Sequence, residues 1–205
     1  MTTQSLEQKI KEVGNPVTML RNSQAGAYVF PIAPEFSNWR DEQEAWRKTA
    51  ILFDQSYHMT DLYVQGPDTV RLLSDLGVNS FQGFKRDKAK QFVACNHDGY
   101  VIGDGVLFAL EDDKVVLVGR PPISNWVHFN AVTGGYNVKV ERDERSLANP
   151  MQRKLYRFEV QGPNAWKILE KVHGGPIPDI KFFAMGEINI AGRKALVCGA
   201  SAGLG

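Results

Sequence analysis

An aspartate between two glycines is the first feature of this sequence that could take part in chemistry. Asp104 lies in the triplet Gly103-Asp104-Gly105, inside a predicted strand from Tyr100 to Leu110. Glycine weakens a strand and commonly marks a bulge or the close approach of a ligand. The carboxylate could therefore face a bound molecule, or it could be a solvent-facing side chain beside a bulge. Residue types alone leave both interpretations open.

Two further polar residues stand at the ends of predicted strands. His58 comes just before one strand, and its imidazole could donate a hydrogen bond to a substrate oxygen because its unperturbed pKa is close to neutrality. Arg120 directly follows an apolar strand and precedes Pro121-Pro122, a stiff turn that suits two-pronged binding of a carboxylate. The alternatives are a structural histidine and a surface ion pair.

Aromatic residues and histidines supply the remaining candidates. A wall for a flat ligand could be formed by Tyr28, Trp39 and Trp126, although aromatic residues at helical spacing more often belong to a core. No metal site is expected, because His97, His128 and His173 lack the mutual spacing of metal ligands.

Helices and strands must bring these residues together. A first helix is expected at about 38–50, with Ser37 as its N-cap. It is followed by alternating elements: a strand through Leu62 and Val64, a helix from Pro67 to Gly77, strands at 90–95, 100–110 and 115–118, a helix at 122–133 and a strand at 136–140. This order is a decorated split β-α-β-β-α-β arrangement, and it predicts an α+β fold.

A short repeat indicates a second, related unit. The segment Val64-Gln65-Gly66-Pro67 recurs 96 positions later as Val160-Gln161-Gly162-Pro163. Each copy follows a predicted strand and opens a helix with an apolar stripe that ends at glycine. The repeat therefore predicts two related ferredoxin-like subdomains.

Bulk composition excludes several classes of partner. The 205 residues are 43% hydrophobic and carry a formal charge of +1, without a basic run that would favour nucleic acid or an anionic membrane. The first residues do not resemble a signal or transit peptide, and no stretch reaches the roughly 18 apolar residues of a membrane span. Together with two widely separated cysteines, these features favour the cytoplasm.

Several segments together resemble the family headed by the glycine cleavage T-protein, an aminomethyltransferase. The resemblance covers roughly residues 20–190 and rests on Glu44-Ala45-Trp46-Arg47, Phe53-Asp54-Gln55-Ser56 with His58-Met59, Gly66-Pro67, and Asp98-Gly99-Tyr100-Val101-Ile102-Gly103-Asp104. In that family the aspartate that matches Asp104 faces the folate and the substrate amine. The resemblance thus implies tetrahydrofolate as cofactor, with Asp104 and Tyr100 at its site and Asp104 in a catalytic role.

Within this family the sequence looks most like tetrahydrofolate-dependent O-demethylases of vanillate-like and syringate-like acids. The segments that suggest this branch are Met19-Leu20-Arg21-Asn22-Ser23, Pro34-Glu35-Phe36-Ser37-Asn38-Trp39-Arg40, Val118-Gly119-Arg120 and Thr133-Gly134-Gly135-Tyr136-Asn137-Val138. The resemblance places His58 near the phenolic oxygen of the aromatic acid, as a catalytic residue, and Arg120 near its carboxylate. Tyr28 is assigned to the same substrate site. The implied reaction moves a methyl group from an aryl ether oxygen to N5 of tetrahydrofolate.

The resemblance also suggests how the chain is divided. We expect a lead-in and helix of the folate-binding domain at 1–52, the first ferredoxin-like subdomain at 53–145, the start of the second at 150–192 and an atypical glycine-rich tail at 193–205. Family members continue into a third, β-rich domain that carries a folate-binding glutamate and a tyrosine linked to demethylation. We therefore expect weak folate binding and no turnover by these residues alone, and self-association through uncovered apolar surface.

Three other functions stay open. The methyl or one-carbon donor could be an amine or a sulfonium compound, and the chain could be a folate-binding module without catalysis. A nucleotide-binding oxidoreductase is suggested only by the glycine spacing after Cys198, which looks like the first turn of a short-chain dehydrogenase.

Overall fold

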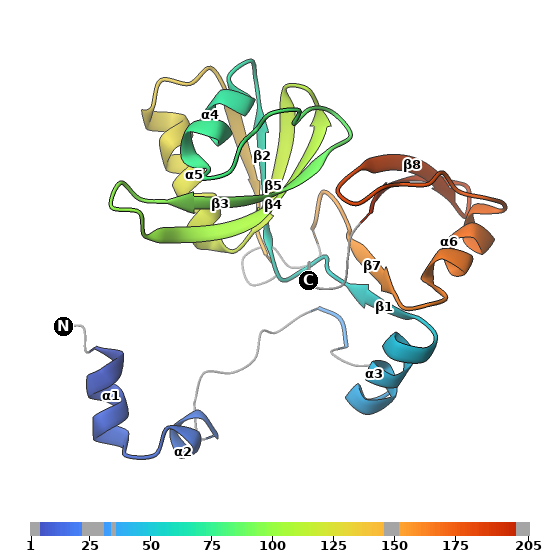
Figure 1. The fold of residues 1–205 in the computed structure, drawn as a ribbon, viewed down its shortest axis with the longest axis horizontal. Helices are drawn as coiled ribbons and strands as arrows, with labels where there is room; N and C mark the ends of the chain where they lie inside the picture. The colour runs from blue at the N-terminus through green and yellow to red at the C-terminus, as the bar shows by residue number, and fades with distance from the viewer. Residues whose placement is uncertain (1–4, 22–30, 34–35, 146–151, 200–205) are drawn as a thin grey trace.

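The computed structural model describes residues 5–21, 31–33, 36–145 and 152–199. Its helices are α1 (Leu6–Val13), α2 (Pro16–Arg21), α3 (Trp39–Lys48), α4 (Thr69–Leu76), α5 (Pro121–Thr133) and α6 (Ala165–His173). Its strands are β1 (Ile51–Asp54), β2 (Thr60–Gln65), β3 (Ala89–Cys95), β4 (Val101–Glu111), β5 (Lys114–Gly119), β6 (Lys139–Asp143), β7 (Phe158–Gln161), β8 (Met185–Ile190) and β9 (Arg193–Cys198). The chain is a mixed α/β protein with antiparallel sheets (Figure 1).

The largest sheet has five antiparallel strands in the order β3-β4-β5-β2-β6. Helices α4 and α5 contact each other and pack on one face of this sheet, where they enclose the main hydrophobic core. Fully buried side chains from both layers meet there, among them Leu62, Leu72, Phe92, Leu117 and Val127. Because neighbouring residues of a strand point to opposite faces, every second residue of this sheet lies on a face that these helices leave open.

Strand β4 shows this alternation clearly. Gly105, Leu107 and Ala109 are buried and face the helices. Asp104, Val106 and Phe108 occupy the alternate positions and are more exposed, so they lie on the open face. Any site built around Asp104 must therefore lie on the face of the sheet away from α4 and α5.

The repeated Val-Gln-Gly-Pro segments form the same turn twice. Gly66 follows β2 with φ +144°, and Gly162 follows β7 with φ +122°. An added Cβ would lie 2.4 Å from the carbonyl oxygen of Asn137 at Gly66, and 2.6 Å from that of Thr49 at Gly162. Each turn thus fits against the backbone just before another strand, and each requires glycine.

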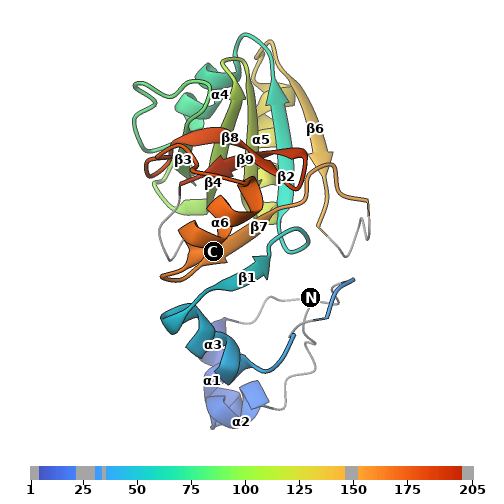
Figure 2. The same cartoon turned by 90° about the vertical axis from the view of Figure 1, so that its right-hand side faces the viewer.

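The partners of these turns reveal which elements correspond. Strand β6 follows α5 and pairs with β2, whereas β1 follows α3 and pairs with β7 (Figure 2). Helix α3 and strand β1 therefore occupy the same place beside β7 and α6 that α5 and β6 occupy beside β2 and α4. The second unit takes a helix and a strand from the N-terminal side of the first, and the expected boundary at residue 52 falls inside β1.

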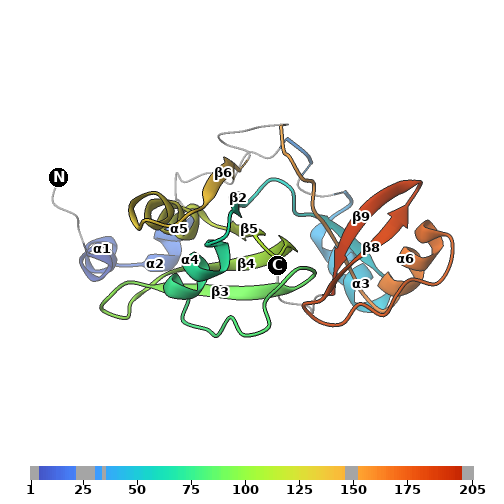
Figure 3. The same ribbon diagram turned by 90° about the horizontal axis from the view of Figure 1, so that it is seen from above.

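The remaining strands form a separate hairpin. Strands β8 and β9 pair with each other from Met185–Cys198 to Ile190–Arg193, and α6 contacts β8 (Figure 3). The expected boundary at residue 193 falls between these two strands, and residues 200–205 of the expected glycine-rich tail lie outside the described residues. The division into domains stays a prediction.

One expected cap was wrong. The N-cap of α3 is Asn38 rather than Ser37, since the Asn38 side chain accepts hydrogen bonds from the backbone N–H groups of Arg40 and Asp41. The Ser37 N–H is held instead by the carboxylate of Glu42, at 3.2 Å. No helix in the described ranges combines the length and apolar character that crossing a membrane requires.

Candidate functional site

Three of the predicted site residues meet at one edge of the large sheet. Gly119 of β5 is paired with Gly105 of β4 on one side and with Thr60 of β2 on the other. Asp104 directly precedes the first of these partners and Arg120 directly follows Gly119. His58 lies two residues before Thr60. The carboxylate thus lies on β4, level with the end of β5 that carries the guanidinium and the start of β2 that follows the imidazole.

Asp104 is exposed and has a polar partner on the open face. The side-chain amide of Gln91, on β3, donates a hydrogen bond to its carboxylate at 3.0 Å. A bulge is present near Asp104: the pairing of β3 with β4 shifts between Ala94 and Cys95, so that Ile102 is an extra residue on β4. The carboxylate and the amide together offer hydrogen-bond acceptors and a donor side by side.

The glycines around Asp104 also make room for packing on the helix-covered face. An added Cβ at Gly103 would lie 3.2 Å from the Cβ of Ile123, and one at Gly119 would lie 2.7 Å from its Cγ2. At Gly105 the obstacle would be the Val118 carbonyl oxygen, at 2.6 Å. Gly103 and Gly119 admit the first turn of α5 on the helix-covered face, and Gly105 admits the backbone of β5. They open no space for a ligand, which would have to approach Asp104 from the other face.

His58 is half-buried in the segment between β1 and β2. Burial lowers the pKa of His58 below its usual value, and the positive charges of Arg157 and Arg120 lower that pKa further. A backbone hydrogen bond at Gln55 and the charge of Asp61 act in the opposite direction. Arg120 is thus one of two cationic residues near the imidazole. His58 is accordingly neutral at pH 7 and keeps one N–H to donate.

A buried ion cluster holds the segment that carries His58. Arg157 donates to the Gln55 carbonyl at 3.4 Å and contacts the Asp61 carboxylate at 3.3 Å. The Ser56 hydroxyl accepts from the Arg157 N–H at 3.0 Å. Arg153, whose side chain is fully buried, lies 3.1 Å from the same Asp61 and 3.5 Å from Asp143. Sequence analysis missed this cluster because its charged members are scattered from residue 61 to 157.

The other predicted residues are less closely associated with this edge. Tyr28 lies outside the described residues. Tyr100 is 74% exposed directly before β4, where its N–H donates to the Asn96 side chain at 2.9 Å. Trp126 stacks on Phe129 within α5, and Trp39 is 51% exposed on α3. The roles assigned to all these residues stay predictions.

Two of the pockets among the described residues have volumes of about 330 Å³ each, and neither is lined by Asp104, His58 or Arg120. One of them lies between β3 and the neighbouring segment of the second unit, where it is lined by Gln91, Phe182 and Phe183. Gln91 links this pocket to Asp104, because it lines the pocket and its side-chain amide donates a hydrogen bond to the Asp104 carboxylate. Within the described ranges, no group of three or more His, Cys, Asp or Glu residues is arranged to hold a metal ion.

The sequence profile of the GCVT N-terminal domain matches residues 17–201. The chain belongs to this family. A syringate O-demethylase from Sphingobium sp. is 51% identical over 191 residues, which are 92% of this chain and 41% of that protein. An aminomethyltransferase from Corynebacterium aurimucosum is 29% identical over 184 residues, which are 84% of this chain and 47% of that protein.

A solved structure of a GCVT-family protein shares the fold. The glycine cleavage system aminomethyltransferase T from Bartonella henselae aligns with a TM-score of 0.56 at 23% identity, covering 71% of this chain and 37% of that one. The chain thus spans less than half the length of each of these relatives.

We predict that His58 titrates below the value of about 6.5 for an unperturbed histidine. Because folding lowers this pKa, the unfolded chain binds the proton more readily, and stability should fall as the pH drops below about 6.5. Replacing Arg120 with glutamine should raise the His58 pKa, whereas Arg40→Gln on α3 should leave it unchanged. NMR titration of the imidazole protons measures the His58 pKa in the wild type and in both variants. Equal values in the wild type and Arg120→Gln would contradict the proximity of Arg120 to His58.

Proposed function

We propose that this chain is the folate-binding part of a tetrahydrofolate-dependent O-demethylase that removes a methyl group from a methoxylated aromatic acid. The observation that carries the proposal is the juxtaposition of neutral His58 and exposed Arg120 at one sheet edge. The 51% identity to a syringate O-demethylase supports the same assignment. Cytoplasmic location and a small-molecule partner belong to this proposal.

The two substrate-binding groups would act at different ends of a flat acid. Arg120 would bind the carboxylate through paired, charge-assisted hydrogen bonds. When the carbon–oxygen bond breaks, the aryl oxygen keeps the bonding electrons and is left as a phenolate. The neutral His58 imidazole would donate its N–H to that oxygen and stabilise the developing charge. Tyr28, by resemblance, would line the same site.

The residues near Asp104 suit a pterin. Its exposed carboxylate can accept hydrogen bonds from pterin N–H groups, and the Gln91 amide beside it can donate as well as accept. Bound tetrahydrofolate supplies N5 as the methyl acceptor. Tyr100 stands four residues before Asp104, where its exposed ring would contact the cofactor from the strand end.

We further infer that the fold consists of two related ferredoxin-like subdomains. The order β4-β5-β2-β6, with α4 and α5 on one face, supports the split β-α-β-β-α-β arrangement for the first. The equivalent turns at Gly66 and Gly162 support a common origin for the second.

A second candidate is an aminomethyltransferase that acts on an amine donor. The Corynebacterium relative and the Bartonella structure favour it, at the lower identities of 29% and 23%. An amine donor without a carboxylate would leave Arg120 without a role, so the two candidates differ in what they require of this residue.

Binding of paired ligands separates these candidates. Vanillate should bind about tenfold more tightly than vanillyl alcohol, which lacks the carboxylate, because one charge-assisted contact is lost. In Arg120→Gln this preference should vanish, while affinity for vanillyl alcohol stays the same. Isothermal titration of the purified chain measures all four affinities. Equal preference for vanillate in the wild type and Arg120→Gln would overturn the assignment of Arg120.

A further inference from the structure

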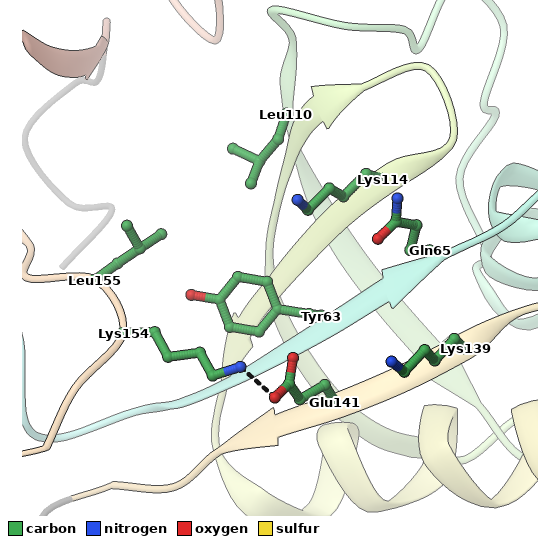
Figure 4. Close-up of a pocket in the computed structure, with 8 residues that line it drawn as sticks. All are labelled: Tyr63, Gln65, Leu110, Lys114, Lys139, Glu141, Lys154 and Leu155. Carbon is green, nitrogen blue, oxygen red and sulfur yellow. Dashed lines mark ion pairs between the residues drawn. The ribbon is translucent and has the colours of Figure 1, made fainter.

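A second pocket lies on the open face of the large sheet, away from the Asp104 edge. It has a volume of about 330 Å³ and is lined by residues of β2, β4, β5 and β6 and of the segment after residue 152 (Figure 4): Tyr63, Gln65, Leu110, Lys114, Lys139, Glu141, Lys154 and Leu155. Leu110 lies six residues beyond Asp104 on β4, or roughly 20 Å at the rise of an extended strand. The pocket is therefore separate from the site proposed for the demethylation.

Strand register explains why basic groups converge here. Gln65 of β2 is paired with Lys114 of β5 on one side and with Lys139 of β6 on the other. Residues paired across strands project to the same face, so two ammonium groups flank one amide in a single row (Figure 4). With neighbouring strands about 4.8 Å apart, the two lysines start roughly 10 Å from each other. A small anion placed over Gln65 can reach both.

The charges in the pocket are incompletely balanced. Lys154 forms an ion pair with Glu141, as Figure 4 shows. Lys114 has only a distant contact with Glu111, at 3.9 Å near the solvent. Among the described residues Lys139 has no ion-pair partner, although it lies near enough to Glu141 to lower the pKa of that carboxyl. The pocket lining thus carries three lysines and one glutamate.

Tyr63 adds an apolar wall and a spare donor. Its ring stands between Lys154 and Lys114 in Figure 4, with the hydroxyl directed towards the side of Leu110 and Leu155. The hydroxyl is buried and has no hydrogen-bond partner among the described residues. Burial, with the charges of Asp61 and Asp143, raises the pKa of Tyr63 to about 12, so the hydroxyl stays protonated at neutral pH. A buried hydroxyl without a hydrogen-bond partner costs free energy, unless a bound molecule supplies that partner.

We propose that this pocket binds a small organic anion, whose carboxylate or phosphate group lies between Lys114 and Lys139 and whose apolar part rests against Tyr63, Leu110 and Leu155. The Tyr63 hydroxyl and the Gln65 amide donate further hydrogen bonds to the same molecule. The site lies beyond the demethylation proposed above and does not depend on it.

Two probes test the site and identify the preferred anionic group. Phenyl phosphate and hexanoate are titrated separately into the ¹⁵N-labelled chain, and backbone amide shifts are followed by NMR. We expect saturable shifts from at least one probe at Tyr63, Gln65, Lys114 and Lys139, without matching shifts at Asp104 or Arg120. The probe with the lower Kd identifies carboxylate or phosphate as the preferred group. Absence of saturable shifts from both probes would overturn the proposal.

Matched variants separate specific binding from general attraction to positive charge. The double variant Lys114→Gln/Lys139→Gln should weaken binding by at least about tenfold. Lys167→Gln/Lys171→Gln on α6 removes the same charge from two exposed positions outside the pocket and should leave binding unchanged. Equal losses of affinity in both double variants would show that binding depends only on overall positive charge, and would overturn the proposal.

Tyr63→Phe keeps the apolar wall and removes only the hydroxyl. This variant should fold at least as stably as the wild type, because it eliminates a buried donor without a partner. It should nevertheless bind the probe about threefold or more weakly. Unchanged affinity in a folded Tyr63→Phe chain would refute the role of the hydroxyl.

Discussion

Replacing Asp61 with asparagine should lower the free energy of unfolding by about 3–5 kcal/mol. The side chain of Asp61 is fully buried and lies 3.1 Å from Arg153 and 3.3 Å from Arg157. Asparagine has nearly the same shape but no charge, so the buried guanidinium of Arg153 would lose one of its two carboxylate partners. Urea denaturation followed by circular dichroism measures the change.

An exposed ion pair provides the control for this substitution. Glu7 and Lys11 pair at 2.6 Å on α1 with side chains that are 76% and 73% exposed. Glu7→Gln should change stability by less than about 0.5 kcal/mol, because water screens such pairs. If Asp61→Asn proved as mild as Glu7→Gln, the buried cluster would have no special role in stability.

The loss of stability in Asp61→Asn should also affect the candidate site. Arg157 joins Asp61 to Gln55 and Ser56, which belong to the segment that carries His58. Weakening the cluster frees this segment from the sheet edge. Amide hydrogen exchange at residues 55–58 should therefore accelerate in Asp61→Asn beyond the increase in the core strands.

Local patterns predicted most of the elements around the main core. Apolar spacing and terminal glycines placed the helices at 67–77 and 122–133 within a few residues of α4 and α5. Strand β1 was missed, because four residues carry little periodicity and their partner β7 lies more than 100 positions away. Only the three-dimensional structure shows that β1, which follows α3, pairs with β7.

The candidate site was predictable to a similar extent. Strand ends pointed to His58 and Arg120, and the flanking glycines pointed to Asp104. The register of three neighbouring strands brings the three positions to one edge. The packing around the flanking glycines could not be predicted, because only the folded structure shows Ile123 beside Gly103 and the Val118 backbone beside Gly105. The row that Lys114 and Lys139 form with Gln65 was likewise invisible, since cross-strand register cannot be read from one strand.

Gly66→Ala and Gly162→Ala should each destabilise the chain by about 2–5 kcal/mol. Both glycines have positive φ, which strains an L-residue, and at both an added Cβ would meet backbone atoms at 2.4 to 2.6 Å. Backbone atoms cannot rotate away as a side chain can. The adjacent strand, β6 in one unit and β1 in the other, would have to move. Thermal or urea unfolding of the two variants provides the measurement.

Gly99→Ala is the control for the steric clash, because it introduces backbone strain without a clash. Gly99 has φ +85° in the turn between β3 and β4, and an added Cβ there would have no atom within 4 Å. Backbone strain alone should cost about 1 kcal/mol at this position. The excess at Gly66 and Gly162 then measures how tightly each turn fits against its neighbour. Because α3 and β1 take the place of α5 and β6, we expect similar excess losses of stability at Gly66 and Gly162. A small loss in Gly162→Ala together with a large loss in Gly66→Ala would argue against equivalent units.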